Sequence, residues 1–189
     1  MKEIIKNALI LFAITLVSSV LLAIAFQVTE EPISVQKIKQ RDAAFATVIP
    51  DATFEEIVDL DFSEYEKIDS VYVAKKADEI IGYTFKLITN EGYSAGIEMV
   101  VGVSIEGTIT GIDVMRHAET PGLGALADEA DFKNQFVSKP LGELSTVKGV
   151  SSNDTQISAI SGATITSKAV TNAVNEAVTY YNNELKEGN

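Results

Sequence analysis

The sequence predicts an α+β protein: an N-terminal transmembrane helix, then an antiparallel sheet domain flanked by helices, with a long C-terminal helix. Three observations carry this prediction. An uncharged apolar run extends from Asn7 to Thr29, β-branched and aromatic residues alternate in segments between 70 and 115, and small apolar residues recur at helical spacing after 166. Strands grouped in the middle with helices at the ends are typical of an α+β domain.

The apolar run is long enough to cross a membrane. At about 1.5 Å per residue it reaches the ~30 Å thickness of the hydrocarbon core. Lys2 and Lys6 precede it and Glu30-Glu31 follow it, so the positive-inside rule places the N-terminus in the cytoplasm. We therefore expect a single-pass protein of the cell (inner) membrane, with its remaining residues outside the cytoplasm.

A cleaved signal peptide is the alternative for this segment. Ala23-Ile24-Ala25 resembles a small-residue cleavage site. The apolar run exceeds the usual length of a signal-peptide core, which favours a retained anchor. The predicted organisation is an anchor over residues 1–29, a juxtamembrane helix or linker over 30–50, and an extracytoplasmic domain over 51–189.

Residues 51–69 are rich in acid and predict a solvated surface. A calcium loop beginning at Asp59 fails, because Glu64 stands where the loop needs Gly and Ser70 where it needs a bidentate Glu. The expected strands then follow, with a turn at Glu106-Gly107: 70–74, 80–88, 97–104 and 108–115.

The segments after the strands alternate between loop and helix. Residues 116–127 predict a Gly/Pro-bearing loop, 128–137 a short helix, and 138–160 mostly loop with room for a short strand. The last helix is expected from about Thr166 to Leu185. Its apolar side is formed by two rows of residues: Val170, Val174, Val178 and Tyr181, and Ala169, Ala173 and Ala177.

Composition excludes several classes of function. The chain carries 27 Asp+Glu against 15 Lys+Arg, a net charge of −12, with no basic cluster, which argues against nucleic acid as a partner. It has no Cys and one His, His117, so iron–sulfur clusters, thiolate metal sites and bis-histidine haem are excluded within one chain. Redox chemistry here needs an organic cofactor.

The stretch SGATITSKAV, residues 161–170, is unusual in hydroxyl content for a helix start. One capping hydroxyl is normal, whereas this stretch offers Ser161, Thr164, Thr166 and Ser167. Two interpretations remain open on the residues alone. The stretch either caps the helix with hydroxyls to spare, or binds an anion at the helix N-terminus, where Gly162 lets a ligand approach the backbone.

The stretch HAETPGLG, residues 117–124, follows a predicted strand and ends in a Gly-rich turn that exposes backbone amides to a flat ligand. Residues 122–127 also match G-x-G-x-x-A, but the preceding hairpin and the absence of βαβ alternation argue against a dinucleotide site. His117 by itself predicts a loop histidine. Residues 92–96 are a Gly-rich turn between strands, interpreted from turn chemistry as a loop.

SGATITSKAV, preceded some forty residues earlier by HAETPGLG, resembles the FMN-binding domain of membrane redox complexes. The chain is similar to the G subunits of Rnf-type ion-translocating ferredoxin:NAD+ oxidoreductases. The related alternative is the C subunit of sodium-translocating NADH:quinone reductases. The resemblance covers nearly the whole chain and depends on both motifs occurring in this order.

The resemblance implies a covalent FMN, its phosphate esterified to Thr164 by a flavin transferase that takes the FMN moiety from FAD. The phosphate would be surrounded by Ser161, Gly162, Ala163 and Thr166. The loop against the flavin would place Leu123 on a ring face, with the remaining contacts from Glu119, Thr120, Gly122 and Gly124. The sequence departs from the family at Ser158, where the attachment motif usually has Asp.

The function implied is that of a membrane-anchored flavoprotein carrying electrons within an ion-translocating complex, with other membrane subunits as partners. No residue is an obvious acid or base for a substrate, so we expect a relay and not a stand-alone dehydrogenase. The alternative from another class is an extracytoplasmic assembly or binding module in which SGAT only caps a helix.

Overall fold

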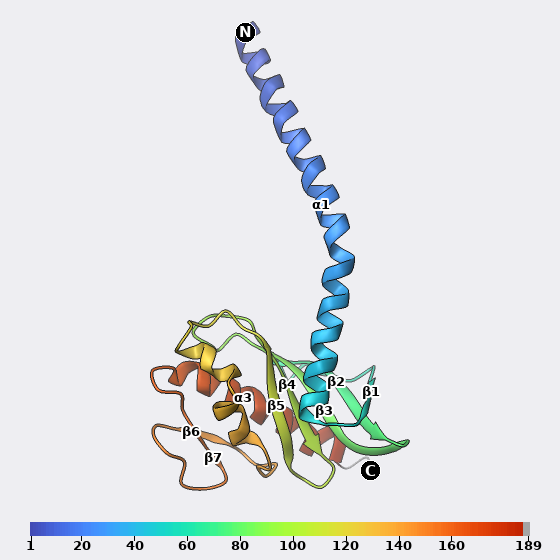
Figure 1. The fold of residues 1–189 in the computed structure, drawn as a ribbon. Helices are drawn as coiled ribbons and strands as arrows, with labels where there is room; N and C mark the ends of the chain where they lie inside the picture. Colours follow the sequence, from blue (N-terminus) through green and yellow to red (C-terminus); the bar gives the residue numbers. More distant parts are fainter. Residues whose placement is uncertain (187–189) are drawn as a thin grey trace. The chain divides into compact units, whose positions relative to one another are not determined.

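The computed structural model describes residues 1–186 and forms two compact units, one ending at Arg41 and the other beginning at Asp42. The first unit is the greater part of one helix, α1 (Lys2–Val48), whose last turns belong to the second unit (Figure 1). The expected anchor and juxtamembrane segment thus form one continuous helix, which contains Pro32. It ends before Pro50, because proline disfavours the helical conformation in the residue that precedes it.

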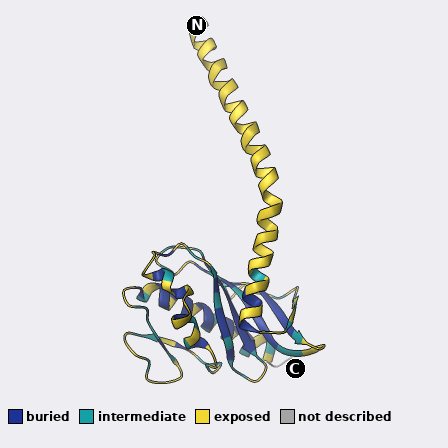
Figure 2. Cartoon of the chain, viewed as in Figure 1, coloured by how far each residue is buried: buried dark blue, intermediate teal, exposed yellow. Residues whose placement is uncertain are grey.

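One helix among the described residues, α1, is long and apolar enough to span a membrane. Its 47 residues correspond to about 70 Å, more than twice the hydrocarbon thickness. Its most apolar stretch buries nothing against the rest of the chain, and only the last turns carry buried side chains (Figure 2). This pattern fits a helix whose apolar surface is covered by lipid.

The second unit is built on a five-stranded antiparallel sheet in the order β1-β2-β3-β4-β5. The strands are β1 (Thr53–Glu56), β2 (Ile68–Lys76), β3 (Glu79–Thr89), β4 (Ile97–Ser104) and β5 (Ile109–Arg116). The four expected strands are confirmed. The short edge strand β1 was not expected, because its exposed Glu55 and Glu56 resemble a solvated acidic loop.

The two faces of the sheet pack against different helices. Val71, Phe85 and Val101 face the main core, shared with α3. On the other face Tyr72, Ala74 and Val100 form a smaller core with the end of α1. Both faces are covered, so the central strands are buried almost continuously instead of in strict alternation.

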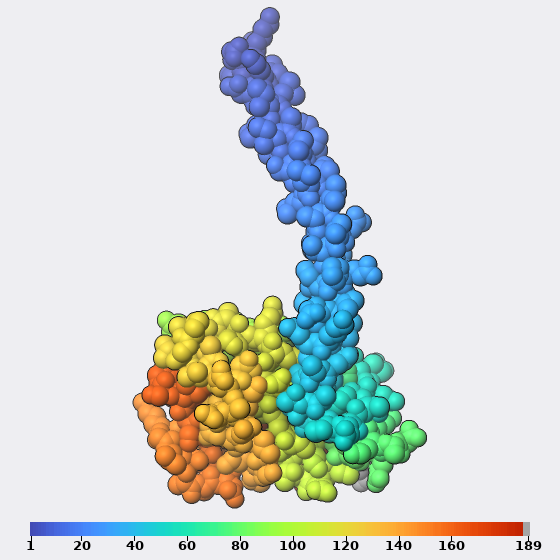
Figure 3. Space-filling model, viewed as in Figure 1, coloured from blue at the N-terminus to red at the C-terminus, as the bar shows by residue number. Residues whose placement is uncertain are grey.

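The chain between β5 and the last helix is broken into short elements. These are η1 (Gly124–Asp128), α2 (Ala130–Lys133), η2 (Asn134–Phe136), β6 (Ser145–Val147) and β7 (Gln156–Ser158). The helix expected over 128–137 is therefore divided, and the expected loop over 138–160 contains a parallel pair, β6–β7. Coloured yellow to orange, this region covers much of one face of the unit in Figure 3.

The last helix, α3 (Thr164–Tyr180), continues as a π-helical turn, η3 (Tyr181–Leu185). Both predicted rows of apolar residues are buried, as expected from their helical spacing. The helix begins two residues before the expected start. The earlier start places Thr164, and not Thr166, at the first helical position.

Candidate functional site

The N-terminus of α3 has no side-chain cap. Its N-cap residue is Ala163, with φ −129° and ψ 44°, and it makes no side-chain hydrogen bond to the amides of the first turn. The first internal amide bond runs from Ser167 N to Ala163 O at 3.0 Å. The amides of residues 164–166 thus have no acceptor among the described residues, and they lie at the positive end of the helix dipole.

The four hydroxyls of SGATITS have different partners. Thr166 donates to Glu119 Oε2 at 2.8 Å. Ser167 donates to Ala163 O at 3.0 Å and accepts the amide of Ile160 at 2.9 Å. Within residues 1–186, the hydroxyls of Ser161 and Thr164 make no hydrogen bond with the protein. Capping therefore does not account for the surplus, and Thr164 keeps a free hydroxyl beside the unbonded amides.

A cavity of about 570 Å³ opens at this helix start. Such a volume is within the usual range for small-molecule sites, about 300–1,000 Å³. The lining combines apolar side chains with backbone and hydroxyl groups, and contains no Lys or Arg: Tyr93, Glu119, Thr120, Leu123, Gly124, Gly162, Ala163, Thr164, Ile165 and Thr166.

Three segments distant in sequence form the cavity walls. These are the β3–β4 loop at residues 90–96, the loop after β5 at 117–124, and the start of α3. Gly162 has φ +77°, a conformation that favours glycine, and a Cβ there would lie 3.0 Å from Leu123 Cδ2. Gly162 therefore lets the second and third walls approach each other closely.

The structure brings together most of the residues predicted from sequence. Eight of the ten line the cavity, while Ser161 and Gly122 lie at exposed adjoining positions and are absent from its lining. Tyr93 and Ile165 also line it and were not singled out. Tyr93 belongs to the Gly-rich turn interpreted as a loop, and Ile165 is 55% exposed at the first turn of α3. For Ile165 the available signal in the sequence was an isoleucine placed between Thr164 and Thr166, among several hydroxyl residues.

Ser158 lies at the end of β7, outside the cavity lining. Its hydroxyl accepts the amide of Ser151 at 2.9 Å, and its backbone is held by the Gln135 side chain, which accepts from Ser158 N at 2.8 Å. The residue at the position of the family's usual Asp thus has a defined structural role in this chain.

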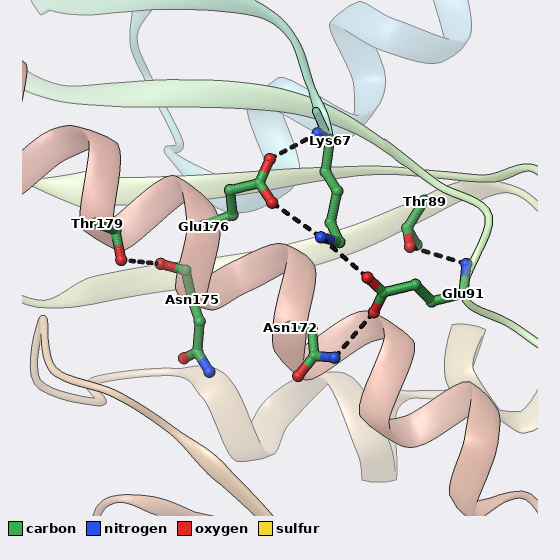
Figure 4. Close-up of polar contacts among 7 residues, drawn as sticks. All are labelled: Lys67, Thr89, Glu91, Asn172, Asn175, Glu176 and Thr179. Carbon is green, nitrogen blue, oxygen red and sulfur yellow. Dashed lines mark hydrogen bonds and ion pairs between the residues drawn. The ribbon is translucent and has the colours of Figure 1, made fainter. Parts of the chain in front are cut away.

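A polar cluster fixes the β3–β4 loop to α3 (Figure 4). Lys67 Nζ lies 3.0 Å from Glu91 and 2.9 Å from Glu176, and Glu91 accepts a hydrogen bond from Asn172 at 2.8 Å. The Asn172 hydrogen bond and Lys67 lower the pKa of Glu91. Burial tends to lower the pKa of Lys67, but its hydrogen bonds and charge interactions with Glu176 and Glu91 outweigh this and raise it.

The site can bind a molecule with an anionic end and a flat apolar part. Unbonded amides and the helix dipole favour an anion next to Thr164. Leu123, Ile165 and Tyr93 supply apolar surface at the cavity mouth. This chemistry matches a nucleotide-like cofactor such as FMN. Among the described residues no group of three or more His, Cys, Asp or Glu side chains is arranged to hold a metal ion.

Two family models match the chain, and the first defines the class of protein. Residues 92–179, which include every cavity-lining residue, match the FMN-binding domain. Residues 1–48, which correspond to α1, match the RnfG N-terminal region. The chain is thus a flavoprotein domain attached to an N-terminal apolar helix.

Relatives that match over most of their length specify the family. The G subunit of the Na(+)-translocating ferredoxin:NAD(+) oxidoreductase complex of Acetobacterium woodii is 36% identical over 98% of this chain and 95% of its own. The G subunit of the ion-translocating oxidoreductase complex of Methanosarcina acetivorans is 33% identical over 95% of both chains. This protein belongs to the family of G subunits of Rnf-type ion-translocating oxidoreductase complexes. The crystal structure of Shewanella oneidensis NqrC shares the fold, with a TM-score of 0.53 at 23% identity over 63% of this chain and 61% of that one.

Proposed function

We propose that this protein is a membrane-anchored electron-carrying subunit of an ion-translocating oxidoreductase complex, with FMN as its redox group. The observation that carries the proposal is the start of α3, where unbonded amides and the free hydroxyl of Thr164 face one cavity. When bound, FMN supplies the electron transfer, and the protein supplies its position and electrostatic surroundings. The cavity offers no His, Lys or Arg for substrate chemistry, which favours a relay.

The cavity residues fit both parts of FMN. The amides of residues 164–166 suit the phosphate, with Gly162 and Ala163 leaving the backbone accessible. Ser161 and Gly122, which are exposed and adjoin lining residues in sequence, would complete the polar surroundings. The flavin ring would lie against Leu123 on the opposite wall, near Thr120 and Gly124.

We propose further that the FMN phosphate is esterified to Thr164. In this reaction the Thr164 oxygen forms a bond to the FMN phosphorus of FAD, the pyrophosphate bond breaks, AMP leaves and the hydroxyl loses its proton. A flavin transferase would catalyse the step. Thr164 is the supported acceptor because Thr166 and Ser167 already hold hydrogen-bond partners and Ser161 lies outside the cavity lining. Thr164 is half-buried in the cavity with its hydroxyl free.

The membrane topology belongs to the same proposal. Lys2 and Lys6 favour a cytoplasmic N-terminus, which places the flavin domain on the outer side of the membrane. A covalent bond suits that location, because a flavin lost outside the cytoplasm would not be readily replaced. The partners are the other membrane subunits of the complex.

The test is the intact mass of the denatured full chain after co-expression with a flavin transferase, followed by peptide mapping. We expect an increment of FMN less one water on the peptide that contains Thr164. Thr164→Val keeps the shape of the side chain and should lose the increment with an unchanged circular dichroism spectrum. If wild type and Ser158→Asp were both unmodified and retained no flavin, the proposal would be refuted in favour of a non-redox module.

Ser158→Asp provides the matched variant for the attachment motif. If only part of the wild-type chain carries FMN and Ser158→Asp raises that fraction, the flavin transferase recognises this position. If flavin were released on denaturation and neither wild type nor Ser158→Asp showed a mass increment, the FMN would be noncovalent. That result would contradict the proposed ester but not FMN binding.

A further inference from the structure

We infer that Glu119 is a positioning residue that ties the three walls of the cavity together and lowers the reduction potential of the bound flavin. The link between the walls, made by hydrogen bonds of Glu119, is argued from the geometry of the chain without flavin and is called the tie below. The effect on the potential rests on the proposed function. The two parts have separate measurements, so either can fail without the other.

The Glu119 carboxylate bonds both neighbouring walls. Its Oε1 accepts the backbone amide of Ser94 at 2.9 Å, from the β3–β4 loop. Its Oε2 accepts the hydroxyl of Thr166 at 2.8 Å, from the first turn of α3. The side chain is 5% exposed, and its own loop forms the remaining wall. One carboxylate therefore links segments that are 25 and 47 residues away in sequence.

Two glycines leave the space that the carboxylate occupies. A Cβ built at Gly92 would lie 2.6 Å from Glu119 Oε1, and one at Gly124 would lie 2.2 Å from Oε2. Both distances are too short for any side chain, and neither glycine has the positive φ that would otherwise explain it. At Gly92 the Cβ would also lie 2.8 Å from Ile97 Cδ1 and 2.9 Å from the Ser94 carbonyl oxygen, whereas at Gly124 its nearest neighbours are Glu119 and Thr166 Oγ1, the latter at 2.7 Å. Gly124 therefore leaves the space for the Glu119–Thr166 pair, which indicates a built site and not an incidental contact.

The hydrogen bond from Thr166 sets the roles of the two threonines on the first turn of α3. Because the Thr166 hydroxyl donates a hydrogen bond to Glu119, it is directed at the neighbouring wall. Thr164, with no such partner, keeps its hydroxyl available in the cavity. Glu119 thereby acts on the flavin site through Thr166 and the Ser94 amide.

The carboxylate also places a negative charge in the cavity wall. Among residues 1–186 no Lys, Arg or His forms an ion pair with Glu119, and both of its partners are neutral donors. A buried charge is weakly screened, so it interacts strongly with a charge added nearby. The Glu119 charge would therefore make the addition of an electron to a flavin bound in this cavity less favourable, and the midpoint potential would be lower.

The tie is tested on the unloaded full chain, expressed without flavin transferase, by hydrogen–deuterium exchange. Glu119→Ala should increase exchange at the Ser94 amide by about tenfold, the effect of losing a typical buried hydrogen bond. It should also increase exchange at the Ser167 amide, which closes the first turn of α3. Thr166→Val should increase exchange in α3 alone, and Thr166→Ser should restore the wild-type rate. Unchanged exchange in Glu119→Ala would overturn the tie.

The charge effect is tested on the loaded full chain by spectroelectrochemical titration. Glu119→Gln keeps the size of the side chain and can still accept from Ser94, but it removes the negative charge. The midpoint potential of the flavin should therefore shift positive. Glu129→Gln is the matched control, since it removes an exposed charge from the adjoining η1–α2 segment and should shift the potential less. Equal potentials for wild type and Glu119→Gln would overturn this part. If neither the wild-type chain nor Ser158→Asp took up flavin, the proposed function would be refuted and the exchange result would still stand.

Discussion

At the scale of single residues, the hydroxyls at the start of α3 look interchangeable in sequence but differ in bonding. Ser167 closes the turn before the helix, Thr166 bonds Glu119, and Thr164 bonds nothing in the described chain. Ser161 is also unbonded, but it lies outside the cavity lining. The four hydroxyls of the motif are thus divided into two structural positions, one exposed position and one that is chemically available in the cavity. The division depends on Glu119, which is 47 residues away.

Gly124→Ala should disrupt the cavity. The new Cβ would lie 2.2 Å from Glu119 Oε2 and 2.7 Å from Thr166 Oγ1, so the carboxylate must move. We expect a loss of about 1–3 kcal/mol in the free energy of unfolding, with reduced flavin loading. Thermal unfolding and the flavin-to-protein absorbance ratio measure the two effects.

Gly142→Ala is the control for this substitution. A Cβ at Gly142 meets nothing within 4 Å, and its φ is not in the left-handed region. Stability and loading should stay at wild-type values. If both variants behaved alike, close packing around the carboxylate would not be the reason for glycine at 124.

At the scale of elements, the polar cluster around Lys67 holds the β3–β4 loop against α3 and should make stability depend on pH. The pKa of Glu91 is lowered in the folded chain, so its contribution is present above its ordinary value of 4.5 and lost as pH falls through the lowered value. The pKa of Lys67 is raised, so its contribution is present below its ordinary value of 10.5 and lost as pH rises through the raised value. Between these limits the cluster contributes fully.

Glu91→Gln should therefore lower the Tm of the full chain in detergent at pH 6–8, and the difference from wild type should diminish below about pH 4.5. Glu91 is 46% exposed, so the effect should also decrease with added salt. Glu143→Gln, which removes an exposed carboxylate outside the cluster, is the control. A difference that persisted unchanged at pH 3 would contradict an ionic origin.

The long elements were predictable from sequence because their patterns are local. Apolar length specified α1, β-branched segments specified β2–β5, and the alanine and valine rows specified the buried side of α3. The edge strand β1 was not predicted, and of the pair β6–β7 the sequence indicated only room for a short strand within residues 138–160. They are held by pairing with distant strands or with each other, as in Thr146 opposite Ile157, and their own residues resemble loops.

The site was predictable where its motifs are contiguous and not where its contacts are long-range. Thr164 and the 117–124 loop follow from two recognisable stretches. Tyr93 enters the cavity from a third segment, and the Glu119–Thr166 bond joins two motifs that sequence treats separately. A carboxylate used for positioning looks in sequence like one used for ligand contact.

At the scale of the whole molecule, the end of α1 belongs to the core of the second unit. Phe45 is 1% exposed, with its ring centroid 5.0 Å from that of Phe54 and 4.7 Å from that of Tyr72. Phe45→Ala should cost about 3–5 kcal/mol in the free energy of unfolding. By the same reasoning, a fragment of residues 42–189 should unfold cooperatively, and a fragment of 50–189 should be much less stable in denaturant titration. Equal stability of the two fragments would mean that these turns of α1 are dispensable for the domain.

The proposed topology can be tested with single cysteines, because the chain has no Cys of its own. Val150 is 92% exposed, so Val150→Cys should react with a membrane-impermeant maleimide added to intact cells or spheroplasts. Lys2→Cys should react only after the membrane is permeabilised, since Lys2 and Lys6 favour retention of the N-terminus in the cytoplasm. The same samples give the intact mass, which separates a retained anchor from a cleaved signal peptide. Labelling of Lys2→Cys, but not of Val150→Cys, in intact cells would mean that the orientation is the reverse of the one proposed. The flavin domain would then lie in the cytoplasm, where a covalent bond would no longer be needed to retain the cofactor.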